Sequence, residues 1–571
     1  MRYKLTPNHF ALLAFIVYSL VFMAYTWPLM WNFSTHFIGK PLTGDSSTYV
    51  WNIWHFRYAI MQGSNPFTTD MLFYPDGTSL VMHAYTPIAG IINLPLNQPI
   101  LALNIVLYLS FIFSGLGTFY LLKHFNINPF LCIIGGFIFS FFPYKTAHLL
   151  EHFNLELTAC IPYFILYFFK TFALQPGRFL PVFVSGENFI YLIIICILSL
   201  LSDYYYSIYL FYFTILLLVI NFSYPRVANW SLKRKLFIGI GVLIVGHFIV
   251  RGLAISGIDD KGALWWTPDM ASLFVPSSRY WLFRNTNWLS IFEQQYFRYP
   301  ESVEFILFPG FCLFILVIIF WLFRKKNPII LTDLMKHIGI AGIIFLLCCF
   351  PVVVVLGRKL FYSIFGLIYY IPFLNNVRTP SRYILMAVLL ILPVLLAGIQ
   401  PLLSKYKHFK WIFAGIVFLA FVEFWPIQYP LISEGNVPRV YKELATKSEG
   451  AILPIPFGLR DGTEEIGRFN TNHYFYQTFH EHPIIGGYIS RLSKANKLQI
   501  NHSSTALELL HLMNGDTLNS ATKNNIDLPI KYIVIEPASI SRFEPYFDHI
   551  MTQQPMIKTR VDDYLLYEIR K

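Results

Sequence analysis

The stretch at 98–122, QPILALNIVLYLSFIFSGLGTFYLL, decides the fold class because it is long, apolar and free of charged residues. A helix of about 20 such residues crosses the hydrocarbon core of a bilayer. The whole chain has the same character: of 571 residues, 56% are hydrophobic and only 13% are charged. Soluble proteins carry about 25% charged residues. The sequence therefore predicts an α-helical polytopic membrane protein.

Apolar runs of this kind recur along the chain, and about eleven spans can be drawn before residue 430. They lie approximately at 10–30, 98–122, 129–142, 155–172, 187–202, 205–222, 236–254, 303–323, 337–356, 383–402 and 411–429. Two further apolar segments, 86–97 and 360–373, are short or contain proline. We expect these two to be re-entrant or interfacial rather than spanning.

Basic residues between the spans predict the orientation, because lysine and arginine collect on the cytoplasmic side. With the N-terminus in the cytoplasm, every even-numbered span exits into a basic cluster. These clusters contain Lys123, Lys170, Arg178, Arg226, Lys233, Arg234, Lys235, Arg324, Lys325, Lys326, Lys405, Lys407 and Lys410. The net charge of +12 follows from the same bias, so we expect no nucleic-acid partner. An odd number of spans leaves the tail after Tyr429 outside.

The tail has a different composition from the rest of the chain and predicts a second domain. It is polar, with strand-like runs at 451–454, 532–535 and 564–569 separated by helical stretches. The predicted domains are therefore a transmembrane domain, 1–429, with outer loops 31–97 and 255–302, and an extracytoplasmic C-terminal α/β domain, 430–571.

Ionisable residues near the span ends all fall on the outer face in this topology. They are Asp45, His148, His152, Asp203, Glu301, Glu304, Arg378 and Arg382. A charged side chain costs roughly 2.5–3.5 kcal/mol at a span centre. A cluster of them on one side of the membrane therefore indicates a site.

Asp45 opens the first outer loop, in front of a run that contains Trp51 and Trp54. This run predicts an amphipathic helix lying in the membrane interface, where tryptophan is favoured. Two interpretations of Asp45 remain open. It caps that helix, or it acts as a general base that takes a proton from an acceptor hydroxyl.

The second cluster is FPYKTAHLLEH at 142–152. On a helix, His148 and His152 share one face because they lie four residues apart. Such a pair can ligate a metal, but a metalloprotease site needs a third ligand and a general base. We prefer recognition of a phosphate or pyrophosphate by Lys145 and the two histidines. The alternative is a polar helix end at the interface.

The remaining candidates lie beside later spans. Asp203 either lines the same cavity or caps a span. Glu304 either compensates a helix dipole or belongs to the site, and it would sit deeper than Glu301. Arg378 and Arg382 flank the start of a helix, where guanidinium groups can bind phosphate oxygens in pairs. The alternative for these arginines is contact with lipid headgroups.

Several short motifs resemble the GT-C class of membrane glycosyltransferases and, within it, a bacterial group of GT-C-like membrane proteins. They are Gly44-Asp45 early in the outer loop, 142–152, Phe274-Val275-Pro276-Ser277, 372–382, Pro454-Ile455-Pro456 and 486–491. The resemblance implies a polyprenyl-phosphate-linked sugar as donor and a catalytic acid early in the outer loop, which maps onto Asp45. Some class members need a divalent metal and others do not, so a metal stays open.

These observations lead to one leading hypothesis and two alternatives. The leading hypothesis is a glycosyltransferase of a bacterial inner (plasma) membrane, acting on a cell-envelope glycan, lipid or protein acceptor at the outer face. Asp45 would be catalytic, and the substrate would be bound by Lys145, His148, His152, Asp203, Glu304, Arg378 and Arg382. The alternatives are a transporter or flippase of a lipid-linked glycan, and a non-catalytic envelope-assembly protein. Charges at one membrane edge weigh against a transporter, which usually binds near the midplane.

Overall fold

The computed structural model describes residues 7–41, 45–255, 262, 264–297, 302–324, 331–371, 377–406, 408–462, 464–493, 496–497, 503–514 and 525–570. Internal contacts divide the chain into two compact units. Unit 1 comprises Met1–Met30 and Leu107–Tyr429, and unit 2 comprises Trp31–Val106 and Pro430–Lys571. The predicted domains follow membrane topology rather than these contacts, and that division stays a prediction.

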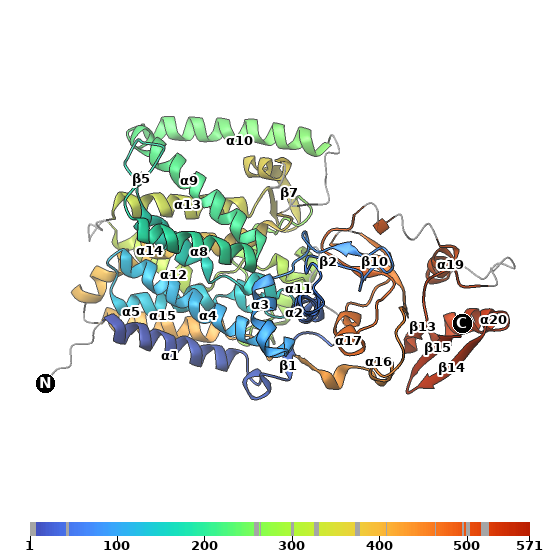
Figure 1. Ribbon diagram of the computed structural model, residues 1–571. Coiled ribbons are helices and arrows are strands. Elements are labelled where there is room, and N and C mark those ends of the chain that lie inside the picture. The colour runs from blue at the N-terminus through green and yellow to red at the C-terminus, as the bar shows by residue number, and fades with distance from the viewer. Residues whose placement is uncertain are drawn as a thin grey trace. The chain divides into compact units, whose positions relative to one another are not determined.

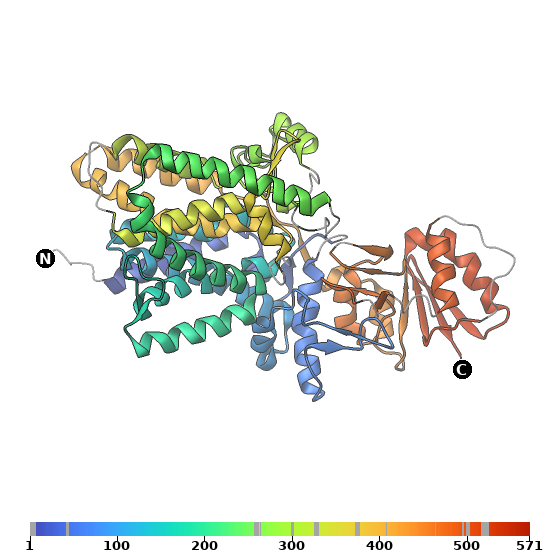
Figure 2. The same cartoon turned by 90° about the horizontal axis from the view of Figure 1, so that it is seen from above.

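Unit 1 is built mainly of helices, and Figures 1 and 2 show its long helices running roughly along one direction. The helices are α1 (Pro7–Tyr25), α4 (Pro99–His124, which begins in unit 2), α5 (Pro129–Phe141), α6 (Pro143–His148), α7 (Cys160–Thr171), α8 (Gly186–Ser202), α9 (Tyr204–Ala228), α10 (Leu232–Ile255), α11 (Asn287–Tyr296), α12 (Phe311–Phe323), α13 (Asp333–Cys348), α14 (Ile384–Lys405) and α15 (Phe409–Glu423). Two short hairpins join some of them: β4 (Phe172–Ala173) with β5 (Val182–Phe183), and β6 (Val352–Val355) with β7 (Arg358–Tyr362).

Six helical stretches of the described chain are long and apolar enough to cross a membrane. They are Asn8–Tyr25, Pro99–His124, Pro129–His148, Tyr204–Ala228, Leu232–Ala254 and Pro380–Lys405. The chain therefore has the character of a multi-pass membrane protein. Shorter apolar helices, such as Gly186–Ser202 and Phe311–Phe323, bring the number nearer to the expected one, but about eleven spans stays a prediction.

Two expected spans differ most from the helices of the structure, each at one end, and proline explains both differences. The span drawn at 337–356 ends at Cys348, because Pro351 cannot continue a helix and the next residues form strand β6. The span drawn at 303–323 begins only at Phe311. The preceding Pro309 and Gly310 break the chain direction, and Gly310 has a φ of 106°, which favours glycine.

The start of α12 is held by a buried carboxylate from α15. Glu423 accepts hydrogen bonds from the backbone nitrogens of Phe311, at 2.8 Å, and Cys312, at 2.9 Å. These are free N–H groups of the first helical turn, which need a partner when buried. The contact fixes the end of the segment that leads from Glu304 into the helix.

A small apolar cluster lies next to the candidate site. Ala147 of α6 packs with Tyr280, Val303 and Ile306, and Phe283 covers them. The segment around Glu304 is thereby packed against the helix that carries His148.

Unit 2 contains strands and helices. Its four-stranded sheet has the order β14 (Met556–Val561), β15 (Tyr564–Ile569), β13 (Tyr532–Ile535), β9 (Ile452–Ile455), in which only β13 and β9 are parallel. The strand-like runs of the sequence are thus β9, β13 and β15. A second sheet joins β11 (Glu465–Gly467), β10 (Gly458–Arg460) and β12 (Gly487–Tyr488). The helices of this part are α16 (Arg439–Leu444), α17 (Asn472–His480), α19 (Ser504–Met513) and α20 (Ile540–Met551), which packs on β13 (Figure 2). Unit 2 also contains the hairpin β2 (Thr68–Thr69) with β3 (Thr78–Ser79), and the pair β1 (His36–Ile38) with β8 (Leu431–Ser433).

The helix expected to lie in the membrane interface is instead buried inside unit 2. This helix, α2 (Ser46–Met61), packs against α3 (Pro87–Leu96) and α17 (Figure 1). The Trp51 indole nitrogen donates a hydrogen bond to Gln477 at 2.6 Å, and the Trp51 side chain is fully buried. The interfacial prediction is wrong because protein, not lipid, covers the aromatic residues.

Candidate active site

A break between α5 and α6 brings the two histidines to one place. Phe142 is extended and Pro143 restarts the helix at its first position, which proline favours. α6 then ends at His148, and a further turn follows. In this turn the backbone nitrogen of His152 donates to the backbone carbonyl of His148 at 2.8 Å. The two imidazole rings lie 5.5 Å apart between centroids.

Glu304 reaches both histidines from a separate segment. It lies in the short 3-10 helix η4 (Val303–Phe305), which Ser302 caps. Its Oε2 is 3.3 Å from Nε2 of His148, and its Oε1 is 3.6 Å from Nε2 of His152. The carboxylate is buried, so these contacts are made with little solvent screening.

Arg382 forms the other side of the cluster. It lies in η7 (Pro380–Tyr383), which leads directly into α14. Its Nε donates to Oε2 of Glu304 at 3.2 Å, and its Nη2 donates to Oε1. The guanidinium also lies over the ring of Tyr205, 4.7 Å from the centroid. Four of the predicted residues, His148, His152, Glu304 and Arg382, therefore meet in one cluster, in which His152 is partly exposed and the other three are buried.

Asp203 lies beside this cluster, where α8 ends and α9 begins. One of its oxygens accepts a hydrogen bond from the Tyr205 nitrogen at 2.6 Å, so it caps α9. The other accepts from the Asn154 side chain at 2.5 Å. Burial raises the pKa of Asp203 to about 6, against the opposing effect of the Asn154 hydrogen bond. Capping is thus observed, and Tyr205 links Asp203 to Arg382.

Lys145 is enclosed by protein groups. Its ammonium donates to the Thr158 hydroxyl at 2.7 Å and to the Glu156 carbonyl at 3.3 Å. The Glu156 carboxylate lies 3.8 Å away, and the Phe111 ring is 4.1 Å from the nitrogen. These contacts join α6 to the following η2 (Phe153–Glu156). They fit a lysine that holds this loop in place, and a role toward phosphate stays a prediction.

The charge of Glu304 is fixed by its neighbours. Burial alone would raise its pKa, but the positive charge of Arg382 holds the pKa well below its usual range. Glu304 is therefore a carboxylate at any physiological pH.

The cluster has the donor set and the spacing of a metal site. His148 Nδ1 donates to the Tyr144 carbonyl at 2.7 Å, which orients Nε2 toward Glu304, the arrangement typical of ligating histidines. One ligand atom each from His148, His152 and Glu304 lies within 4.8 Å of the others. Bonds of about 2.0–2.1 Å in a tetrahedron place ligand atoms roughly 3.4 Å apart, and each histidine lies at about this distance from a different oxygen of Glu304. Two histidines and a carboxylate fit a divalent metal with an open position.

Three predicted residues remain, namely Asp45, Arg378 and Glu301. Asp45, in unit 2, occupies the N-cap position of α2, but its side chain makes no capping hydrogen bond. The Tyr488 hydroxyl donates to its Oδ2 at 3.4 Å. Arg378 is half-buried, four residues before Arg382. Glu301 lies outside the described residues.

Three supporting residues were not singled out from the sequence. Tyr144 could have been found from the sequence, because it lies four residues before His148. In the structure its ring centroid is 4.2 Å from the His148 imidazole. Asn154 and Tyr205 act on residues distant in sequence, and no local pattern signals such contacts.

No family model and no curated protein matches the chain. Solved structures with a similar fold include the archaeal oligosaccharyltransferase AglB from Archaeoglobus fulgidus in complex with an inhibitory peptide and a dolichol-phosphate (9% identity, TM-score 0.45, 99% of this chain and 74% of that chain). An Archaeoglobus fulgidus oligosaccharyltransferase in complex with Zn and sulfate has 10% identity and a TM-score of 0.42, and the match covers 94% of this chain and 69% of that chain. Arabinofuranosyltransferase AftD from Mycobacteria has 12% identity and a TM-score of 0.46; the match covers all of this chain and 42% of AftD.

AglB and AftD are both GT-C glycosyltransferases, the class that the sequence motifs resemble. Because all these TM-scores are below 0.5, function has to be inferred from this chain's own residues.

Proposed function

We propose that this chain is a membrane glycosyltransferase that moves a sugar from a polyprenyl-phosphate donor to a cell-envelope glycan, lipid or protein acceptor. The observation that carries the proposal is the largely buried cluster of His148, His152, Glu304 and Arg382 beside apolar helices. Ionisable groups in such surroundings are costly and usually serve function. The reaction would take place at the outer face of a bacterial inner membrane, with the N-terminus in the cytoplasm.

Arginine would serve the donor side of the reaction. A departing polyprenyl phosphate carries negative charge that must be compensated. Both Glu304 oxygens already accept from Arg382, so we assign Arg382 to holding Glu304 anionic and in place. We assign the phosphate contact to Arg378, which is only half-buried.

The histidines and Glu304 would hold a divalent metal, which when bound supplies further positive charge to the donor phosphate. Tyr144 would keep His148 in the orientation that this requires, through its carbonyl. Lys145 would hold the loop that carries His152 and Asn154 in place, through its hydrogen bonds to Thr158 and Glu156. Asp203 would position Asn154 and the first turn of α9.

Asp45 would act on the acceptor. Its carboxylate does not cap α2 and accepts one long hydrogen bond from Tyr488, so lone pairs are available for a proton. The acceptor oxygen would attack the anomeric carbon while its proton passes to Asp45. The bond from that carbon to the phosphate oxygen breaks, and the electron pair leaves with polyprenyl phosphate. A single displacement of this kind inverts the anomeric configuration.

A mass profile of glycans and glycolipids tests the proposal in cells. Cells lacking the protein are complemented at matched membrane abundance with wild type, Asp45→Asn, or Asp70→Asn, an exposed acid of the same unit. We expect wild type and Asp70→Asn to restore a missing sugar increment and Asp45→Asn to fail. Full restoration by Asp45→Asn would contradict the assignment of the base. If cells lacking the protein have an unchanged glycan and glycolipid profile, the proposal that it is a transferase is contradicted.

A further inference from the structure

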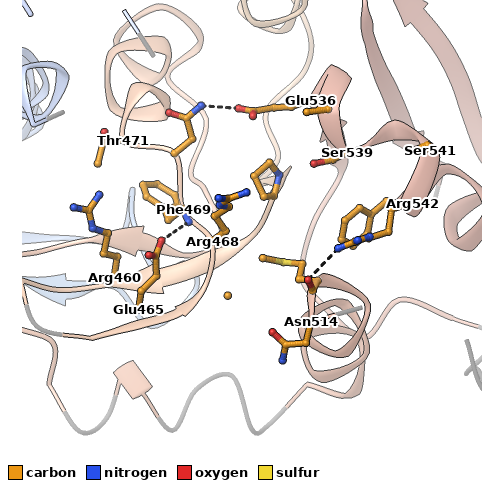
Figure 3. A pocket seen from close by; sticks show the side chains of 16 residues that line it. Arg460, Glu465, Arg468, Phe469, Thr471, Asn514, Glu536, Ser539, Ser541 and Arg542 are labelled. Atoms are coloured by element: carbon orange, nitrogen blue, oxygen red, sulfur yellow. Dashed lines mark hydrogen bonds between the residues drawn. The ribbon is translucent and has the colours of Figure 1, made fainter. Parts of the chain in front are cut away.

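A large polar pocket in the C-terminal part of unit 2 is not used by the proposed chemistry. Its volume is about 760 Å³, which is enough for a ligand of several rings. One wall is the hairpin of β10 and β11 with the segment that follows, and the opposite wall is the start of α20 (Figure 3).

Three arginines line the pocket, and none pairs with an acid there. Within the described residues, the Arg468 guanidinium has no hydrogen-bond or ion-pair partner, and in Figure 3 it extends between the two walls. Arg460 lies over the Tyr488 ring, 5.2 Å from its centroid. Arg542 donates to the Met513 carbonyl at 3.0 Å, which uses one of its five N–H groups.

Both acids that line the pocket are engaged by wall groups instead. Glu465 accepts from the Phe469 backbone nitrogen at 3.3 Å. Glu536 accepts from the Asn470 side chain at 2.8 Å, a bond drawn as a dashed line at Glu536 in Figure 3. His473 Nε2 lies 3.4 Å from the same carboxylate. Three guanidinium groups and two carboxylates share one cavity without forming an ion pair among the described residues. Guanidinium groups left with free donors suit carboxylate or phosphate groups of a ligand.

The rest of the lining suits hydroxyl groups. Asn514, Ser539 and Ser541 offer short polar side chains on the α20 side of the pocket. Such groups recognise hydroxyls through directional hydrogen bonds. The cavity is also much larger than a single inorganic anion requires.

We propose that this pocket binds an anionic oligosaccharide, with Arg460, Arg468 and Arg542 contacting carboxylate or phosphate groups on its sugar rings. That the ligand is a glycan rests on the proposed function. That it is anionic rests on the unpaired arginines of the pocket.

Isothermal titration of the full-length protein in nanodiscs of zwitterionic lipid tests this proposal. The acidic probes are tetragalacturonate, which carries carboxylates, and a phosphorylated maltotetraose. The neutral probe is maltotetraose, and inorganic phosphate serves as the small anion. We expect at least one acidic probe to bind ten or more times more tightly than maltotetraose and phosphate. The acidic probe that binds identifies which anionic group the pocket accepts.

Matched variants localise the binding. Arg468→Gln and Arg542→Gln, both at exposed side chains, should each weaken the acidic probe at least tenfold. Arg560→Gln, at an exposed arginine of β14 outside the pocket, should change the affinity less than twofold. Equal affinity for acidic and neutral probes would overturn the proposal. So would an equal loss of affinity for the acidic probe in Arg468→Gln and Arg560→Gln. If inorganic phosphate binds as tightly as the acidic probes, the proposal that the ligand is an oligosaccharide is overturned.

A further variant separates this proposal from the proposed function. Glu304→Gln should abolish sugar transfer and leave the titration unchanged. A wild type that transfers sugar but binds all probes equally overturns only the pocket. A wild type that binds acidic sugars selectively but transfers none overturns only the transferase.

Discussion

Arg382 and Glu304, which lie 78 residues apart in the sequence, form a buried two-point ion pair. The pair joins η4 to η7, and so connects the segment before α12 with the start of α14. Removing one partner of such a pair leaves a buried charge without compensation.

Arg382→Gln should therefore destabilise the protein by roughly 3–5 kcal/mol. The double variant Arg382→Gln/Glu304→Gln should cost less than the sum of the two single variants, because no lone charge remains. Thermal unfolding in detergent measures this. Lys336→Gln, which breaks an exposed pair with Asp333, should change little. Additive losses in the double variant would contradict the coupling.

Metal content should depend on the two histidines. We expect wild type reconstituted with Zn²⁺ or Mn²⁺ to hold about one ion per chain, measured by elemental mass spectrometry after desalting. His148→Ala and His152→Ala should lose it, because each removes one of three ligands. His549→Ala, at an exposed histidine of α20, should keep it. Equal metal in all four proteins, or none in wild type, would contradict the site.

Arg378→Gln should lower kcat/KM for the lipid-linked donor roughly 10²–10³-fold, as loss of a preorganised charge contact does. Thermal unfolding should change little, in contrast to Arg382→Gln. Arg378→Lys should recover part of the rate, since it keeps the charge but loses the fork. Arg358→Gln, at an exposed arginine of β7, is the control. If the Arg378→Gln protein is as active as this control, the assignment of Arg378 to the donor phosphate is contradicted.

Buried histidines of unit 2 should make the protein acid-sensitive. Burial lowers the pKa of His83 and His473 to about 3 and that of His55 to about 4, from 6.5. Below pH 6.5 the unfolded chain binds protons that the folded chain does not. Stability should therefore fall as pH drops from 6.5 toward 4, by about 1.4 kcal/mol per pH unit for each histidine. The pH dependence should be shallower in His83→Gln and unchanged in His549→Gln. An equal slope in both variants would contradict this.

Helices of the membrane part could be predicted because the length of an apolar run is a local property. All but the first residue of the stretch 98–122 lies within Pro99–His124. Helix ends were less predictable, since Pro309 and Pro351 interrupt runs that remain apolar on both sides. Hydrophobicity alone does not register such breaks.

The site was predictable only in part, because some of its contacts join segments that are distant in the sequence. The spacing of His148 and His152 indicated one shared face, and they do face Glu304 together. That Arg382 pairs with Glu304 depends on how distant segments pack. The burial of α2 is a similar case, because its aromatic residues are covered by α17, which lies over 400 residues later.

The most direct test is release of polyprenyl phosphate by the purified protein in liposomes that contain a lipid extract of the cells that make it. We expect wild type to release polyprenyl phosphate with a matching glycosylated product. Asp45→Asn and Glu304→Gln should be at least roughly 10²-fold slower. Movement of a lipid-linked glycan across the bilayer without such release, or an Asp45→Asn protein as fast as wild type, would contradict the account.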